Sequence, residues 1–112
     1  MKKIHHRSEA LSCELVVGSL PGSGVEVLVE FCATGNYRPV AVDLARAIAR
    51  EFGESDVCIR LAPSHGGRFE VSVDGRLIFS KRATYRIPAA DEIFYHVAVA
   101  RTKLEKRLAC AV

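Results

Sequence analysis

The residue of this sequence best suited to chemistry is Cys32, which lies between an apolar run and a short turn. The run, 25–31, is rich in valine, and the turn, 33–36, precedes an amphipathic segment. This order places the thiol between the carboxyl end of a strand and the amino terminus of a helix. Backbone N–H groups there stabilise a thiolate and lower the pKa of a thiol, and the positive charge of Arg38 acts in the same direction. Cys32 is therefore our candidate nucleophile, and we expect its thiol to be partly exposed.

The segments around this thiol predict the elements that hold it. Residues 25–31 alternate in part between apolar and charged, which indicates a strand with one buried face. Asn36 is a suitable N-cap, and Pro39 is tolerated only in the first turn of a helix. Apolar residues then recur at helical spacing until Gly53: Val40, Leu44, Ala47, Ile48 and Phe52. A short strand over 57–61 completes a βαβ unit, whose two strands we expect to be parallel.

A β-hairpin is predicted next, after a loop at 63–67. Residues 68–73 and 76–80 alternate around Asp74-Gly75, which is the strongest short signal for a hairpin. We expect three residues of its first strand to share the core face: Phe69, Val71 and Val73. A loop at 81–87 follows, with basic residues around Tyr85.

The last predicted element is a helix that Pro88 opens, with Asp91 and Glu92 at its positive end. Its expected buried stripe comprises Ile93, Val97, Ala100, Leu104 and Leu108. Cations gather toward its carboxyl end, where they suit the helix dipole: Arg101, Lys103, Lys106 and Arg107.

The order of elements defines an α/β fold, β-α-β-β-β-α, with a four-stranded mixed sheet and both helices packed on it. Residues 1–24 form an N-terminal extension that ends in a Gly/Ser/Pro linker, and 25–112 form one domain. Within the extension, Cys13 to Val17 could add a short edge strand.

The composition limits the classes of partner that this protein is expected to bind. The 112 residues contain 16 Lys and Arg against 13 Asp and Glu, a net charge of +3 without a long basic run. This balance argues against a nucleic-acid partner. No stretch approaches the roughly 18 apolar residues of a membrane span. The sequence carries no signal for an oligomeric state.

The four cysteines have neither C-x-x-C spacing nor a regular disulfide rhythm: Cys13, Cys32, Cys58 and Cys110. With no apolar leader after Met1, we expect reduced thiols in a cytoplasmic protein. Cys58 should lie at the opposite end of the sheet from Cys32, so a disulfide between them is not expected. Cys13, in the extension, stays open as a resolving thiol. The adjacent His5 and His6 lack metal-site spacing, and we expect no metal.

Three segments resemble the selenoprotein W-like (Rdx, SelT/SelW/SelH) family: Val29-Glu30-Phe31-Cys32, Arg50-Glu51-Phe52-Gly53 and the run from Gly66 to Gly75, G-G-R-F-E-V-S-V-D-G. The resemblance covers about residues 25–98. It implies a thioredoxin-like fold in which the first cysteine of a redox pair ends the first strand.

The sequence departs from this family pattern at Gly35. The family has cysteine or selenocysteine three residues after the first cysteine, which Cys32 matches, whereas here that position is glycine. A dithiol cycle at this motif is therefore ruled out. A monothiol cycle stays available, in which the Cys32 thiolate forms a mixed disulfide or a sulfenic acid and glutathione or another thiol resolves it.

The thioredoxin-like architecture would bring the loop at 63–67 beside the thiol. The candidate flanking residues are then Ala33, Thr34, Gly35, Asn36, Tyr37, Arg38, His65, Gly66 and Gly67. His65 there could stabilise a thiolate or act as general base, or simply be solvated. Tyr37 could shield the thiol, contact a partner, or only begin the helix. Gly66 and Gly67 suit a close approach of a partner backbone.

Two functions follow from these residues. The leading hypothesis is a thiol-redox protein that acts through Cys32 alone, with glutathione or a disulfide-bearing or thiol protein as partner and no bound cofactor. The alternative is an interaction module that keeps the thioredoxin-like shape and has lost redox activity. A weaker third hypothesis is that the basic loop from Lys81 to Arg86 contacts an acidic protein or a nucleic acid.

Overall fold

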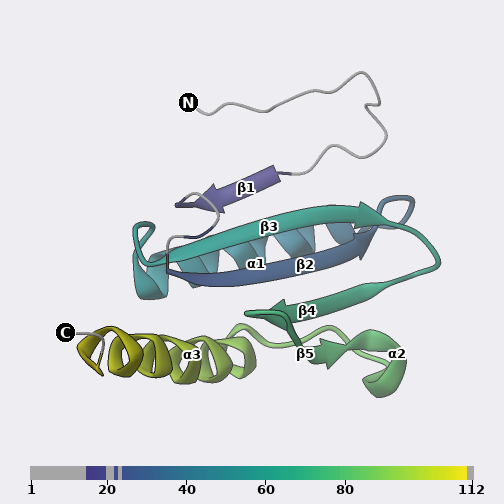
Figure 1. The fold of residues 1–112 in the computed structure, drawn as a ribbon. Coiled ribbons are helices and arrows are strands. Elements are labelled where there is room, and N and C mark those ends of the chain that lie inside the picture. The colour runs from purple at the N-terminus through teal and green to yellow at the C-terminus, as the bar shows by residue number, and fades with distance from the viewer. Residues whose placement is uncertain (1–14, 20–21, 23, 111–112) are drawn as a thin grey trace.

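The computed structural model describes residues 15–110 except 20, 21 and 23 (Figure 1). Its elements are β1 (Leu15–Gly18), β2 (Val25–Cys32), α1 (Tyr37–Phe52), β3 (Val57–Ser64), β4 (Phe69–Val73), β5 (Arg76–Ser80), α2 (Lys81–Thr84) and α3 (Ala90–Cys110). Among these helices, none is long and apolar enough to cross a membrane.

The sheet has five strands in the order β1-β3-β2-β4-β5, so the prediction of four strands is wrong. β2 and β3 are parallel neighbours joined through α1, as the βαβ pattern predicts, and the other pairings are antiparallel. The fifth strand, β1, comes from the predicted extension and pairs Leu15 with Leu61. It overlaps the edge strand proposed for 13–17, of which Cys13 lies outside the described residues.

The core lies between the sheet and the two long helices. Alternate residues of β2 are buried on the helix side, and Figure 1 shows α1 behind β2 and β3. The α1 residues that complete this core are Ala41, Leu44, Ala45, Ile48, Ala49 and Phe52. Two members of the predicted stripe, Val40 and Ala47, are only half-buried, because the buried face centres on the small side chains of Ala41 and Ala45. Each fully buried large apolar side chain contributes about 1.5–3 kcal/mol.

The helix α1 begins as predicted but is not capped as predicted. Asn36 occupies the N-cap position without a side-chain hydrogen bond to the helix, because its backbone (φ −91°, ψ 35°) is not extended. Pro39 lies in the first turn, and the N–H of Gly53 donates to the carbonyl of Ala49 at the other end.

The second parallel strand is longer than predicted. β3 reaches Ser64 rather than Leu61, because β2 pairs with it along its full length, up to Cys32 opposite Ser64. The predicted loop at 63–67 therefore starts at His65.

The hairpin β4–β5 is confirmed, and Phe69, Val71 and Val73 are buried. Asp74 (φ 49°) and Gly75 (φ 85°) both adopt positive φ, as the tight turn of a two-residue hairpin requires. The Asp74 carboxylate also accepts a hydrogen bond from the N–H of Glu26, which ties the turn to the start of β2.

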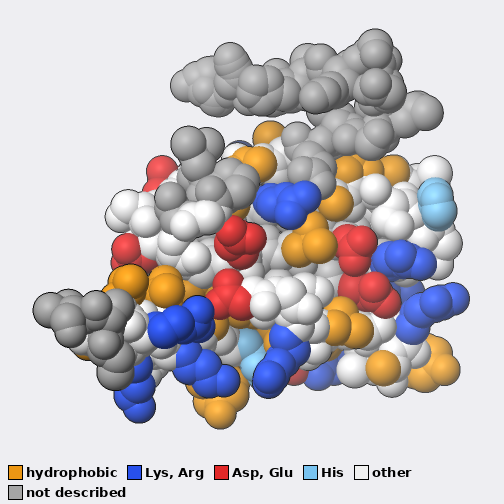
Figure 2. Space-filling model, in the orientation of Figure 1, with side chains coloured by type: hydrophobic (Ala, Val, Ile, Leu, Met, Phe, Trp, Pro, Cys, Tyr) orange, Lys and Arg blue, Asp and Glu red, His pale blue; other side chains and the backbone are white. Residues whose placement is uncertain are grey.

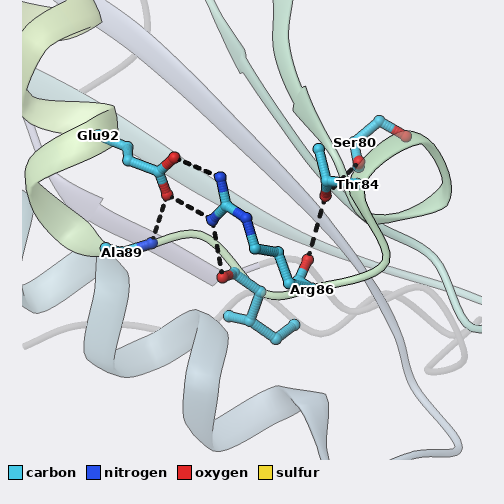
Figure 3. Close-up of polar contacts among 6 residues, drawn as sticks. Ser80, Thr84, Arg86, Ala89 and Glu92 are labelled. Carbon is cyan, nitrogen blue, oxygen red and sulfur yellow. Dashed lines mark hydrogen bonds and ion pairs between the residues drawn. The ribbon is translucent and has the colours of Figure 1, made fainter.

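The segment 81–87 is not entirely a loop, because its first four residues form the single turn α2. Thr84 Oγ1 donates to the carbonyl of Ser80 there (Figure 3). The side chain of Arg86 donates to both carboxylate oxygens of Glu92, which also accepts a hydrogen bond from the N–H of Ala89. These partners, Arg86 first, lower the pKa of Glu92 to about 2. The contacts anchor the start of α3.

The helix α3 starts at Ala90, two residues after Pro88, and only its first half is buried as predicted. Ile93 and Val97 are fully buried, whereas Leu108 is 62% exposed. Figure 1 shows why: the last turns of α3 extend past the strands, so the sheet offers no surface there for the predicted stripe.

Candidate functional site

Cys32 is the last residue of β2, and main-chain hydrogen bonds hold it from two sides. Its N–H donates to the carbonyl of Arg68 at 2.7 Å, and the N–H of Ala33 donates to the carbonyl of Ser64 at 2.9 Å. The central strand, the end of β3 and the entry to β4 therefore fix the backbone at the thiol.

The electrostatic surroundings of this thiol favour the thiolate. Cys32 Sγ lies 3.2 Å from Thr34 Oγ1. This hydrogen bond, followed by backbone hydrogen bonds from Gly67 and Thr34, lowers the pKa of Cys32 from 9.0 to about 7, although burial opposes the change. At neutral pH a large fraction of the thiol is therefore ionised, and the thiolate is the nucleophilic form.

The partial exposure expected for Cys32 is wrong, since this residue is only 4% exposed. The turn that stabilises the thiolate also covers it, because the Thr34 hydroxyl and the Gly67 backbone approach it closely. The turn residues themselves are exposed: Ala33, Thr34, Gly35 and Asn36. Access to the sulfur therefore requires a small movement of this exposed turn.

The ring of Tyr37 lies so close to Gly35 that it leaves no room for a side chain there. A Cβ added at Gly35 would lie 2.8 Å from Cε2 of Tyr37 and 2.9 Å from Cδ2. The Tyr37 ring packs against Phe69, with centroids 6.2 Å apart. Tyr37 thus occupies the space that a side chain at position 35 would need.

A lysine from a distant part of the chain completes this arrangement. Lys81 Nζ lies 5.6 Å from the ring centroid of Tyr37 and donates to the carbonyl of Gly67 at 3.5 Å. The sequence interpretation placed Lys81 only in a basic loop and missed this role. The Asp74-Gly75 signal indicated only that a tight hairpin returns the end of β5 to the start of β4; the contact with Tyr37 depends on the register of the two strands. Figure 1 shows α2 directly after β5 and near β4, at the end of the sheet where β2 and β3 finish.

Two predicted supports of the thiolate do not act on it. Arg38 lies with its guanidinium 5.1 Å from the ring centroid of Phe31. His65 is exposed at the start of the loop after β3. Neither is among the groups that lower the pKa of Cys32. The loop reaches the thiol instead through the backbone of Gly67, and both Gly66 (φ 77°) and Gly67 (φ 70°) have the positive φ that glycine tolerates best.

The other cysteines lie away from this site or outside the described residues. Cys58 is fully buried in β3 and lies opposite Glu26 of β2. Cys32 of β2 lies opposite Ser64, which is also in β3. Six residues of strand separate these positions, about 20 Å at 3.3 Å per residue, far beyond disulfide range. Cys13 and the side chain of Cys110 are not described. Within the described ranges, no group of three His, Cys, Asp or Glu residues could hold a metal ion.

A mixed sheet with a βαβ unit, an antiparallel hairpin and a thiol between the first parallel strand and its helix defines a thioredoxin-like α/β protein. Residues 26–98 match the family model of the Rdx family, and the chain belongs to that family. The resemblance noted in the sequence is therefore confirmed, and with it a place among thioredoxin-like, redox-related proteins.

Two curated relatives show how far the likeness extends. Migration and invasion enhancer 1 of Mus musculus is 35% identical over 60 residues, which cover 54% of this chain and 50% of that protein. Selenoprotein W of Sus scrofa is 37% identical over 60 residues, which cover 53% of this chain and 69% of that protein. The chain thus spans only half the length of the first relative.

Solved structures support the thioredoxin-like fold. A selenoprotein W-related protein from Vibrio cholerae superposes with a TM-score of 0.60 at 22% identity, covering 67% of this chain and 94% of that one. A protein from Bordetella parapertussis gives the same TM-score at 19% identity, covering 67% and 95%. At these identities the likeness concerns the fold alone.

Proposed function

We propose that this protein is a monothiol redox protein that acts through Cys32 in a reducing, cytoplasmic environment. The observation that carries the proposal is the hydrogen-bond set at the thiol, which lowers the pKa of Cys32 to about 7. A cysteine with a purely structural role does not need hydrogen-bond donors directed at its sulfur. A nucleophilic cysteine needs them, because they stabilise the thiolate. Membership of a redox-related family supports the same function.

The proposed cycle needs no second thiol in the motif. The Cys32 thiolate attacks one sulfur of a disulfide, forms a mixed disulfide and releases the other sulfur as a thiolate. A glutathione thiolate then attacks the mixed disulfide at one of its two sulfurs. Attack at the substrate's sulfur frees the Cys32 thiolate and leaves the substrate glutathionylated. Attack at the sulfur of Cys32 frees the substrate thiolate and leaves Cys32 glutathionylated. A further glutathione returns Cys32 to the thiolate and leaves as oxidised glutathione. Gly35 stands where the family pattern has the internal resolving residue.

A test of this proposal is a thiol titration combined with mass spectrometry of the protein treated with oxidised glutathione. We expect a thiolate absorbance midpoint near pH 7 that is lost in Cys32→Ser, and one glutathione attached at Cys32. A Cys32 pKa at or above the 9.0 of the free group, with Cys32→Ser equal to the wild type in mixed-disulfide exchange, would refute it.

The burial of Cys32, which is 4% exposed, favours the second candidate, an interaction module without redox activity. In this function the exposed turn 33–36 and the Gly66–Gly67 loop would form the contact surface. The titration above separates the two candidates, because the module requires no ionised thiol.

The third hypothesis, a binding role for the basic loop, has less support. Arg86 is paired with Glu92, and Lys81 donates to Gly67. Two of its cations therefore have partners within the protein.

A further inference from the structure

A groove separates the β4–β5 hairpin from α3, at the end of the sheet away from Cys32. It encloses about 180 Å³, more than ten times the roughly 10–15 Å³ that one water needs. Four of its lining residues are basic or titratable to a cation: Arg76, His96, Lys103 and Arg107. Figure 2 shows a histidine between Lys and Arg side chains along α3 on this side of the molecule.

The basic lining comes from two elements that are far apart in the sequence. His96, Lys103 and Arg107 lie 7 and 4 residues apart on α3, a spacing that aligns them on one face of the helix. Arg76 reaches the groove from the first position of β5. The fold therefore assembles the cluster, which no continuous basic run in the sequence reveals.

These charges have no anionic partner within the described ranges. None of them takes part in the ion pair of Arg86 with Glu92 or in that of Arg101 with Asp56. The acidic residue in the groove lining, Asp74, accepts the N–H of Glu26 through one carboxylate oxygen, which directs that oxygen toward β2. The groove thus holds an excess of positive charge.

The helix dipole does not explain the cluster. It favours cations in the last turn of α3, where Arg107 lies. It gives no reason for Arg76 on the hairpin or His96 near the middle of the helix. Like charges brought together repel one another, and a bound anion would remove that repulsion.

We propose that this groove binds a phosphate group. Two guanidinium groups present planar forks that match phosphate oxygens, and the lysine ammonium adds a compact charge. The remaining lining of the groove is mostly apolar, with Val73, Ile78, Val99 and Ala100, so the charged side chains select the ligand. The phosphate is carried either by a soluble molecule or by a lipid headgroup, and the site is independent of the redox chemistry at Cys32.

The test uses the full chain, with inorganic pyrophosphate as the soluble probe, titrated by calorimetry and by amide chemical shifts. We expect saturable binding with shifts concentrated at His96, Val99 and Lys103. Lys103→Gln and Arg107→Gln should each weaken binding about tenfold. Lys106→Gln is the matched control, because it removes the same charge from α3 outside the groove and should leave binding unchanged.

A second arm replaces pyrophosphate by vesicles of phosphatidylcholine with or without phosphatidic acid. Cosedimentation with the acidic vesicles that Lys103→Gln weakens and Lys106→Gln does not would assign the phosphate to a lipid. The proposal is overturned if neither probe binds saturably, or if Lys103→Gln and Lys106→Gln weaken binding equally, since the effect is then net charge alone. Unchanged thiol titration at Cys32 in each variant verifies that the fold is retained.

Discussion

The two strand cysteines, Cys32 and Cys58, make an instructive comparison because burial barely distinguishes them. They lie in the adjacent parallel strands β2 and β3, and they are 4% and 0% exposed. Cys32 ends its strand, so turn hydroxyl and backbone N–H groups converge on its sulfur. Cys58 lies inside its strand between Val57 and Ile59. The position of a thiol at a strand end, rather than its exposed area, therefore gives it a chemically distinct environment.

The largest effect expected from this difference is in the rates of thiol modification. In a Cys13→Ser, Cys110→Ser background, we expect Cys32 to react with an aromatic disulfide at least about 1,000-fold faster than Cys58, because only a turn must move to expose Cys32. Cys58 requires opening of the sheet, which costs several kcal/mol. Stopped-flow absorbance measures both rates. Cys32→Ser in the same background assigns the fast phase, and comparable rates for the two thiols would contradict the comparison.

The next effect concerns the missing redox position. Gly35→Cys should destabilise the protein by about 1–3 kcal/mol, because the new Cβ meets the Tyr37 ring at 2.8 Å. We expect that variant to form little disulfide with Cys32, and the double variant with Tyr37→Ser to form it readily. Urea unfolding and free-thiol counts measure both effects.

Gly35→Ala is the control for this experiment, since it adds the Cβ without a thiol. If Gly35→Ala is as stable as the wild type, the Tyr37 ring moves freely and steric exclusion does not explain the result.

How much of this site the sequence could predict depends on the range of the interaction. The strand–thiol–helix order around Cys32, the first-turn Pro39 and the Asp74-Gly75 hairpin are local signals, and the structure confirms them. The sequence predicted four strands and left the fifth, at 13–17, only as a possibility, because β1 is just four residues long. Its pairing with β3 depends on a partner more than forty residues away in the sequence.

The exposure of Cys32 and the position of Lys81 were not predictable in the same way. Burial of the thiol depends on how the Gly67 loop closes over the turn, which no local pattern specifies. Lys81 reaches Tyr37 only through the register of β4 and β5. Arg38 shows the opposite error: sequence proximity suggested an electrostatic role, but its guanidinium stacks on Phe31.

A smaller effect isolates the hydroxyl that distinguishes the Cys32 environment. Thr34→Val should raise the pKa of Cys32 from about 7 toward 9.0, by about one pH unit, because the side-chain hydrogen bond is its largest cause. The thiolate absorbance as a function of pH measures this directly. Thr34→Ser retains a hydroxyl and should keep the wild-type midpoint. An unchanged midpoint in Thr34→Val would assign the lowered pKa to the backbone donors instead.

The last effect is on the pH dependence of stability, and its sign follows from the same thiol. The folded pKa of Cys32, about 7, lies below the 9.0 of the free group. Between these values the unfolded chain binds the proton that the native protein has released, so stability increases with pH. This contribution is fully present above pH 9 and is lost as the pH falls through 7.

We therefore expect the urea midpoint of the wild type, measured against Cys32→Ser at each pH, to rise from pH 7 to pH 9. Because the two proteins share every other titrating group, the contributions of those groups to the pH dependence cancel in the comparison. Glu92 is one of them, and it titrates far below this range. Cys58→Ala provides the contrast, because it removes a buried thiol that lies within β3, away from the turn at Cys32. If the wild type and Cys32→Ser change in parallel over this range, the hydrogen bonds at Cys32 do not favour its thiolate in solution, and the two strand cysteines are equivalent.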